Sequence, residues 1–125
     1  MKYKKVTVAG GGVLGSQLAF QIAYCGYDVT IWLSEEQFVQ VAKDKIDDLN
    51  KAYISYIKEM EKGEAFYHGI AKEGKFNKEK CLNKVERAYK NIKYKTDLAA
   101  CLKDCDLLVE SIPEVKEIKK DFFSS

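Results

Sequence analysis

The sequence predicts an α/β fold built around a parallel β-sheet. Two β-rich runs, residues 4–9 and 28–33, flank a helical stretch in which Leu14, Leu18 and Ile22 recur every four residues. A strand, a helix and a second strand within about 30 residues form a unit whose two strands run parallel. We therefore expect these two strands to start the sheet. The helix is expected to pack on it through one apolar face, in which Ala19 and Ala23 lie beside the larger residues and let the helix sit close to the sheet.

A long amphipathic segment follows the second strand. Apolar residues recur at spacings of three and four over residues 38–60, which predicts one helix of roughly 35–40 Å. Ser34 is expected to cap this helix, with Gln37 as its capping-box partner. A second helix over residues 77–88 is predicted to return along the first. Together they form a helical hairpin, within about residues 35–90, that we expect to project as an arm.

Two further strands extend the predicted sheet to about four strands. Residues 91–95 predict a short third strand, after which Thr96 or Asp97 caps a short helix. Residues 106–112 are an apolar run typical of a buried parallel strand, and Pro113 ends it. A last helix is expected beyond that proline. The fourth strand should lie at an open edge of the sheet, and such an edge favours self-association.

Composition and charge exclude several classes of partner. The net charge of +2 is too close to zero to favour nucleic-acid binding. No apolar stretch reaches the roughly 18 residues of a membrane-spanning helix. The apolar run after the charged N-terminus breaks at glycines and is too short for a signal peptide. We expect residues 1–125 to form one domain of a cytoplasmic protein, truncated before its last strands, that binds neither nucleic acid nor membrane.

The cysteines and the single histidine predict no metal site. Cys101 and Cys105 are four residues apart, but the spacing of the four cysteines matches no zinc motif. In a cytosolic nucleotide-binding fold these thiols are expected to be reduced and buried. His68 falls in the predicted hairpin and is expected to lie on the surface.

A glycine motif lies where the first strand meets the first helix. The sequence GGGVLG, which begins at Gly10, fits G-x-G-x-x-G, and its place inside a strand–helix–strand unit favours a dinucleotide site over a structural turn. Gly10 allows a sharp turn, Gly12 leaves room for a pyrophosphate, and Gly15 lets the helix pack closely on the strand. The free N–H groups that open the helix, around Val13 and Leu14, would face the phosphates. The sequence thus predicts a Rossmann-type fold that binds NAD or NADP.

The end of the second strand bears on the choice between NAD and NADP. An acid about 20 residues after the glycine loop usually binds the adenosine ribose, and Leu33 stands there. Either Glu35 takes this role after a small shift of register, or the hydroxyls bond mainly to Ser34 and to the backbone. Glu35 and Glu36 have a second interpretation, as acids that favour the dipole of the following helix. With two carboxylates and no arginine nearby, NAD is predicted over NADP.

Later motifs point to one family. Thr96-Asp97-Leu98 is followed by the run DLLVESIPE, which begins at Asp106, and then by KKDFF, which begins at Lys119. Together with the glycine loop and the helical insertion, these segments resemble the 3-hydroxyacyl-CoA dehydrogenases, including the bacterial 3-hydroxybutyryl-CoA dehydrogenases. The resemblance covers nearly the whole chain. It implies the NAD-binding domain of an oxidoreductase of fatty acid metabolism that interconverts 3-hydroxyacyl-CoA and 3-oxoacyl-CoA.

The resemblance also implies roles for single residues. Three residues would line the cofactor cleft at the end of the fourth strand: Ser111, Ile112 and Pro113. Glu114 and Lys119 match positions that contact the ribose on the nicotinamide side; the alternative, an ion pair between them, has poor helical geometry. Glu110 matches an acid of the family. Lys51 and Lys58 of the hairpin would either contact CoA phosphates or form a solvated face.

The same resemblance places the chemistry elsewhere. In the family the catalytic histidine, its glutamate partner and the residues that bind substrate lie beyond the position of Ser125, so no catalytic residue is predicted within this chain. The 125-residue segment alone is expected to be inactive. The complete enzyme is expected to take an acyl-CoA and to form a homodimer through a C-terminal domain. The alternatives are another Rossmann dehydrogenase, against which the long insertion argues, and a non-catalytic nucleotide-binding module.

Overall fold

The structure is a computed structural model that describes residues 4–111. Its strands are β1 (Lys5–Ala9), β2 (Asp28–Trp32), β3 (Lys93–Lys95) and β4 (Leu107–Glu110). Its helices are α1 (Val13–Tyr24), α2 (Gln37–Lys62), α3 (Lys78–Asn91) and α4 (Leu98–Asp104). Each element lies where the sequence predicts it, within a few residues at its ends. The last helix, predicted beyond Pro113, lies outside the described residues.

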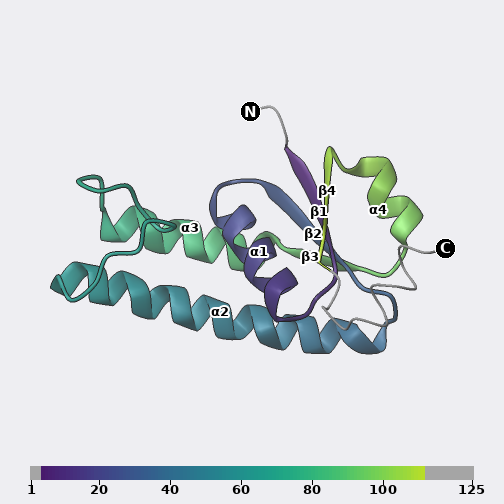
Figure 1. Ribbon diagram of the computed structural model, residues 1–125, viewed down its shortest axis with the longest axis horizontal. Helices are drawn as coiled ribbons and strands as arrows, with labels where there is room; N and C mark the ends of the chain where they lie inside the picture. Colours follow the sequence, from purple (N-terminus) through teal and green to yellow (C-terminus); the bar gives the residue numbers. More distant parts are fainter. Residues whose placement is uncertain (1–3, 112–125) are drawn as a thin grey trace.

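The four strands form one parallel sheet in the order β3-β2-β1-β4. Val6 pairs with Val29 of β2 on one side and with Leu107 of β4 on the other. Residues 6–9 of β1 are all buried, as expected for a parallel strand covered on both faces. Figure 1 shows α1 and α3 on one side of the sheet and α4 on the other. This arrangement confirms the predicted Rossmann-type fold with a helical insertion between β2 and β3.

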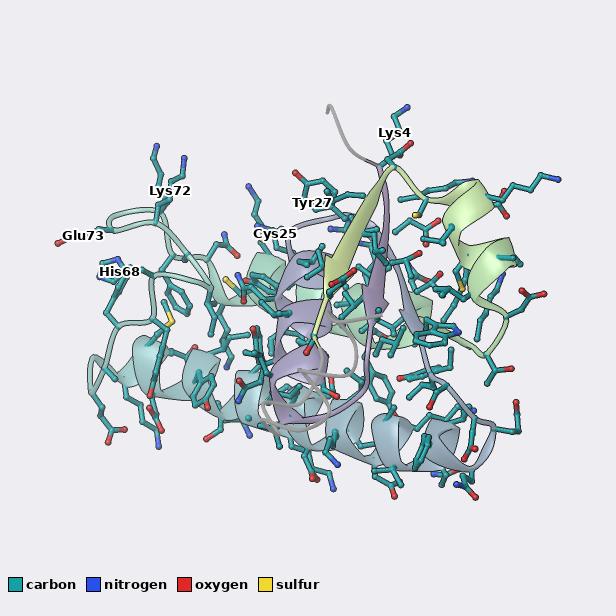
Figure 2. All side chains as sticks on the ribbon, turned by 45° about the vertical axis from the view of Figure 1, so that its right-hand side comes forward. Lys4, Cys25, Tyr27, His68, Lys72 and Glu73 are labelled. Carbon is teal, nitrogen blue, oxygen red and sulfur yellow. The ribbon has the colours of Figure 1, made fainter. Side chains whose placement is uncertain are left out.

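A carboxylate joins the beginnings of β1 and β4. Asp106 Oδ2 accepts hydrogen bonds from the backbone N–H groups of Lys4 and Lys5, both at 3.0 Å. These two bonds hold the pKa of the Asp106 carboxyl below its usual range. Figure 2 labels Lys4 at the end of the sheet where both strands begin. The contact fixes the register of β4 beside β1.

The buried face of α1 contains only part of the predicted one. Ala19 and Ala23 are buried as predicted, but Leu14 is 59% exposed, and Leu18 and Ile22 are only half-buried. The buried residues lie one position further along the chain: Gly15, Ser16, Ala19, Phe20, Ala23 and Tyr24. Glycine and alanine allow the helix axis to come close to the sheet, which a stripe of leucines would prevent. Close approach outweighed side-chain size in selecting this face.

The hairpin of α2 and α3 packs against α1 along part of its length. The loop between the two helices folds back, so that Tyr24 Oη donates to the carbonyl of Ile70 at 2.6 Å and Gln21 Nε2 donates to that of Gly69 at 2.7 Å. The ring of Tyr53 on α2 lies 4.6 Å from that of Phe20, centroid to centroid. Figure 1 shows the far end of the hairpin extending past the sheet. The predicted arm is therefore anchored to α1 by buried polar and aromatic contacts.

The prediction that Ser34 caps α2 is wrong. The N-cap is Glu36, and no side chain accepts a bond from the first turn. The carbonyls of Glu35 and Glu36 accept from the N–H groups of Phe38 and Val39 instead, at 3.1 Å each. Backbone hydrogen bonds thus replace the capping box, and the Ser34 hydroxyl does not cap the helix. The short helix α4 is capped as predicted, since the Asp97 side chain accepts from Ala100 N.

The cysteine thiols are all free, but only two of them are buried. Cys81 and Cys101 lie in the interior, whereas Cys25 is exposed and Cys105 is half-buried. The expectation of buried thiols therefore holds for half of the set. Burial raises the pKa of the Cys101 thiol, which disfavours its reactive thiolate form. Within residues 4–111 no three metal-ligating side chains gather, and no helix there is both long and apolar enough to cross a membrane.

Candidate functional site

The glycine loop leaves the carboxyl end of β1, beside the ends of β2 and β4. Gly10 N donates to the carbonyl of Trp32 at 2.9 Å, and Ser111 N donates to the carbonyl of Ala9 at 2.9 Å. Gly10 has a φ of +116°, and a Cβ atom there would overlap the carbonyl oxygen of Ser111. Only glycine fits both the dihedral angle and the close neighbour. The sharp turn predicted at this position is present.

Gly15 brings the helix against the loop. A Cβ atom on this residue would overlap the carbonyl oxygen of Gly10 and lie 2.9 Å from Ser111 Oγ. The next residue, Ser16, is buried and its hydroxyl donates to the carbonyl of Gly11 at 3.1 Å. The start of α1 is therefore locked onto the loop, and this fixes the direction in which its N-terminus points.

Gly11 has a role that the sequence motif did not reveal. A Cβ atom there would lie 2.6 Å from Leu33 Cδ2 and 2.9 Å from the Cβ of Ala42. The loop therefore packs on the end of β2 and on α2 at once. The motif leaves this second position variable, so the motif alone carries no signal for it. The requirement comes from the long inserted helix, whose small residue Ala42 is fully buried against the loop.

Gly12 faces open space. Among the described residues, no atom lies within 4 Å of the position that its Cβ would take, and its φ of −73° is one that any residue adopts. As the N-cap of α1 it has no side-chain hydrogen bond, and the first N–H groups of a helix, here those of Val13 and Leu14, have no partner inside the helix. Free amides, the positive end of a helix dipole and room for a bulky anion fit a pyrophosphate.

A cleft of about 520 Å³ opens in front of this loop. Its walls come from the ends of β1, β2 and β4, the glycine loop and the first turns of α2. The predicted site residues that line it are Gly10, Gly12, Leu33, Ser34 and Ser111. Val13, Leu14 and Gly15 form the adjoining start of α1. Four predicted contacts lie outside the described residues: Ile112, Pro113, Glu114 and Lys119.

The end of β2 separates the two hypotheses for the adenosine ribose. Leu33 is buried with its side chain against Gly11, so it offers the cleft an apolar surface and no hydrogen-bond acceptor. Ser34 is exposed and lines the cleft. Glu35 does not line it, and its carboxylate accepts from the side chain of Gln37 instead. The geometry therefore supports Ser34 and the backbone, and not Glu35, as the ribose contacts.

One face of α2 forms a wall that sequence reasoning missed. Phe38, Val41 and Lys45 line the cleft, and their spacing of three and four residues places them on one helical stripe. Phe38 and Val41 are 42% and 48% exposed, which is unusual for large apolar side chains on a helix whose neighbouring stripe is buried. The sequence showed the helical period of these residues. It could not show that the stripe faces a cleft, because this depends on where the glycine loop lies relative to α2.

The single histidine lies far from this cleft. Figure 2 shows His68 in the loop at the tip of the hairpin, near Lys72 and Glu73. It is exposed, as predicted, and its ring meets the edge of Phe66. Lys51 and Lys58 on α2 are exposed as well, and neither lines the cleft.

Comparison with known proteins identifies the family of this chain. The model of the 3-hydroxyacyl-CoA dehydrogenase NAD-binding domain matches residues 5–125. The chain belongs to this family. NAD is accordingly the cofactor of the domain, as the glycine loop predicts. A search of curated proteins gave no match.

Solved structures of 3-hydroxyacyl-CoA dehydrogenases and related enzymes share the fold. A diketoreductase, from work on substrate-directed dual catalysis of dicarbonyl compounds, is 31% identical over 99% of this chain, with a TM-score of 0.71. The 3-hydroxybutyryl-CoA dehydrogenase of Escherichia coli K12 is 25% identical over 98%, with a TM-score of 0.64. FadB2 of M. tuberculosis is 22% identical over 98%, with a TM-score of 0.63, which supports the fold alone. The chain spans 37%, 21% and 35% of these three proteins.

Proposed function

We propose that the glycine loop holds the pyrophosphate of NAD, with the adenosine half beside Ser34 and the nicotinamide half beside Ser111. Three features support this placement: the open space at Gly12, the unpaired amides at the start of α1, and the cleft that continues from the loop. Ligands of open parallel sheets bind beside the carboxyl ends of the strands, where the order of connections reverses. That reversal falls between β1 and β4, next to the loop. Ile112, Pro113, Glu114 and Lys119 complete the proposed nicotinamide side.

We further propose that the complete protein interconverts 3-hydroxyacyl-CoA and 3-oxoacyl-CoA. NAD, when bound, accepts the hydride from C3 of the alcohol, or returns it as NADH. The role of the described residues is to bind the cofactor and to orient it at the ends of the strands. The observation that carries the proposal is the glycine loop opening on the cleft, in a chain that the family model matches over residues 5–125.

The general base is proposed to lie outside residues 1–125. Removal of the hydroxyl proton needs a base within hydrogen-bond reach of the substrate. His68, the chain's single histidine, stands at the tip of the hairpin and not at the cleft. Residues 1–125 alone are therefore proposed to bind NAD without turnover, and homodimerisation is assigned to a C-terminal domain. A cytoplasmic location, expected from the sequence, remains part of this proposal.

A second candidate function is the reduction of dicarbonyl compounds without CoA. The 31% identity with the diketoreductase favours it. A 3-oxoacyl thioester and a 1,3-diketone present the same pair of carbonyl groups, so the chemistry at C3 is shared. The two candidates differ in whether binding energy from the CoA moiety contributes to turnover.

Two measurements on the complete protein test these proposals. The first is titration with NADH by calorimetry, which is expected to show one site. The second is NADH oxidation with acetoacetyl-CoA and with 2,4-pentanedione, a diketone with no CoA moiety. Faster turnover of the thioester supports the dehydrogenase proposal, and faster turnover of the diketone supports the second candidate. A folded protein that does not bind NADH contradicts the placement of the cofactor.

A further inference from the structure

Lys45 stands in the cofactor cleft at the place where dehydrogenases choose between NAD and NADP. It lies on the stripe of α2 that also presents Phe38 and Val41 to the cleft. Long side chains on a helix lean toward its N-terminus. The Lys45 side chain therefore leans toward the beginning of α2, and Lys45 and Ser34 both line the cleft. Within residues 4–111, no carboxylate forms a salt bridge with it.

Among residues 4–111, no carboxylate lines the cleft beside the end of β2. An acid at the end of β2 binds the two ribose hydroxyls of NAD and repels a 2′-phosphate, but Leu33 is apolar and buried. Glu35 is hydrogen-bonded to Gln37, and neither Glu35 nor Glu36 lines the cleft. These two carboxylates therefore make no direct contact with a ligand in the cleft, and their charges act on it only through solvent.

Among the described residues, Glu110 is the one acid that lines the cleft, and it lies in the other half. Glu110 ends β4, and β1 lies between β4 and β2 in the sheet. Since neighbouring strands are about 4.8 Å apart, the ends of β2 and β4 are separated by nearly 10 Å. The carboxylate at the end of β4 and the lysine on the α2 wall therefore face different halves of a dinucleotide.

We propose that this cleft accepts a 2′-phosphorylated adenosine, so that NADPH binds with an affinity close to that of NADH. Lys45 Nζ and the Ser34 hydroxyl hold the phosphate, the first by charge and the second as a hydrogen-bond donor. The proposal rests on the placement of the adenosine half proposed above. It adds NADP to NAD as a ligand and assigns cofactor choice to α2, an element outside the usual strand–loop–helix motif.

The test is a set of calorimetric titrations of the purified protein with NADH and NADPH. NADPH is expected to bind within about tenfold of NADH. Lys45→Gln should weaken NADPH binding about tenfold and change NADH binding less than twofold, because only NADPH carries the 2′-phosphate. Lys51→Gln is the matched control, an exposed lysine on the same helix that does not line the cleft. Ser34→Asp should weaken NADPH binding selectively through charge repulsion.

Smaller probes localise the effect to the adenosine half. Adenosine 2′,5′-bisphosphate should bind more tightly than adenosine 5′-phosphate, and added salt should reduce this difference. NADH binding with NADPH more than a hundredfold weaker would overturn the inference and leave the proposed NAD site intact. Equal weakening of both nucleotides by Lys45→Gln would also overturn it, since it would reveal a packing role. Failure of both nucleotides to bind the folded protein would reject the NAD site as well.

Discussion

Gly15 packs so closely on Gly10 that a Cβ atom at position 15 would overlap the carbonyl oxygen of Gly10. Within residues 4–111, the Cβ position of Gly12 has no neighbour within 4 Å. Glycines of one short motif thus meet different requirements. Gly10 and Gly15 are needed for the chain to turn and for α1 to pack closely, and Gly12 is proposed to leave room for the pyrophosphate. Substitutions should therefore separate stability from binding.

Gly12→Ala is expected to leave the protein folded and to weaken NADH binding at least tenfold. The new methyl group meets no protein atom, so the stability change should stay within about 1 kcal/mol, the cost of alanine at an N-cap. It occupies the space proposed for the pyrophosphate. Thermal unfolding and calorimetric titration of the same sample measure both effects. The control, Gly15→Ala, should lower stability by about 1–3 kcal/mol through overpacking. Unchanged affinity in Gly12→Ala would argue against the placement.

Gly11→Ala is expected to destabilise the protein, although the motif tolerates other residues here. Its Cβ would lie 2.6 Å from Leu33 Cδ2 and 2.9 Å from Ala42 Cβ, and overpacking of this kind costs about 1–3 kcal/mol. Chemical denaturation gives the change in unfolding free energy. The double variant Gly11→Ala with Leu33→Ala should lose less stability than the sum of the losses in the two single variants, because removing the Leu33 side chain removes the nearer contact. A loss that is simply additive would show that the clash is relieved elsewhere.

Asp106→Asn is expected to lower the melting temperature at neutral pH and to have little effect in acid. The pKa of the Asp106 carboxyl is lowered by the N–H groups of Lys5 and Lys4. Its contribution is therefore complete above its ordinary pKa of about 4 and is lost as the pH falls through the lowered value. Melting curves of both proteins between pH 7 and pH 2.5 should converge at the acid end. A difference that does not depend on pH would mean that the charge is irrelevant.

Tyr24→Phe is expected to loosen the loop between α2 and α3. The change removes the 2.6 Å hydrogen bond to the Ile70 carbonyl and leaves that buried oxygen without this partner, at a cost of about 1–3 kcal/mol.

Burial raises the pKa of Tyr24, and it raises that of Tyr53 to about 12. Stability from these phenols is full below their ordinary pKa of about 10 and declines as the pH rises toward 12. Alkaline unfolding of the wild-type protein should therefore begin above pH 10, and Tyr53→Phe should reduce its steepness.

Element type and order followed from local signals in the sequence. The glycine loop, the β-rich runs and the caps act through neighbours in the chain, so Asp97 could be recognised as the cap of α4. The buried face of α1 could be identified only in part in this way. Leu14 and Leu18 match a helical period as well as Ala19 and Ala23 do, and only the distance between helix and sheet selects the small residues. That distance is a tertiary property.

The candidate site likewise contains some features that local sequence signals predict and others that depend on tertiary contacts. The turn at Gly10 and the close packing at Gly15 could be predicted, because backbone geometry near a strand end depends on nearby residues in the chain. Lys45 and Gly11 could not, because both depend on where α2 crosses the end of the sheet. Figure 1 shows this crossing, which joins segments separated by more than thirty positions in the chain. No pattern of residue types within either segment predicts the contact.

The strand order β3-β2-β1-β4 places the strand that carries the glycine loop between two partners. Amide hydrogens at the sheet margins, in the three-residue β3 and in β4, can exchange with solvent through local fraying. Those of Val6 and Val8 are expected to exchange only when the whole sheet opens, since β1 is bonded on both sides. The glycine loop is thus attached to the slowest-exchanging part of the fold. Local fraying of β3 or β4 leaves the loop in place.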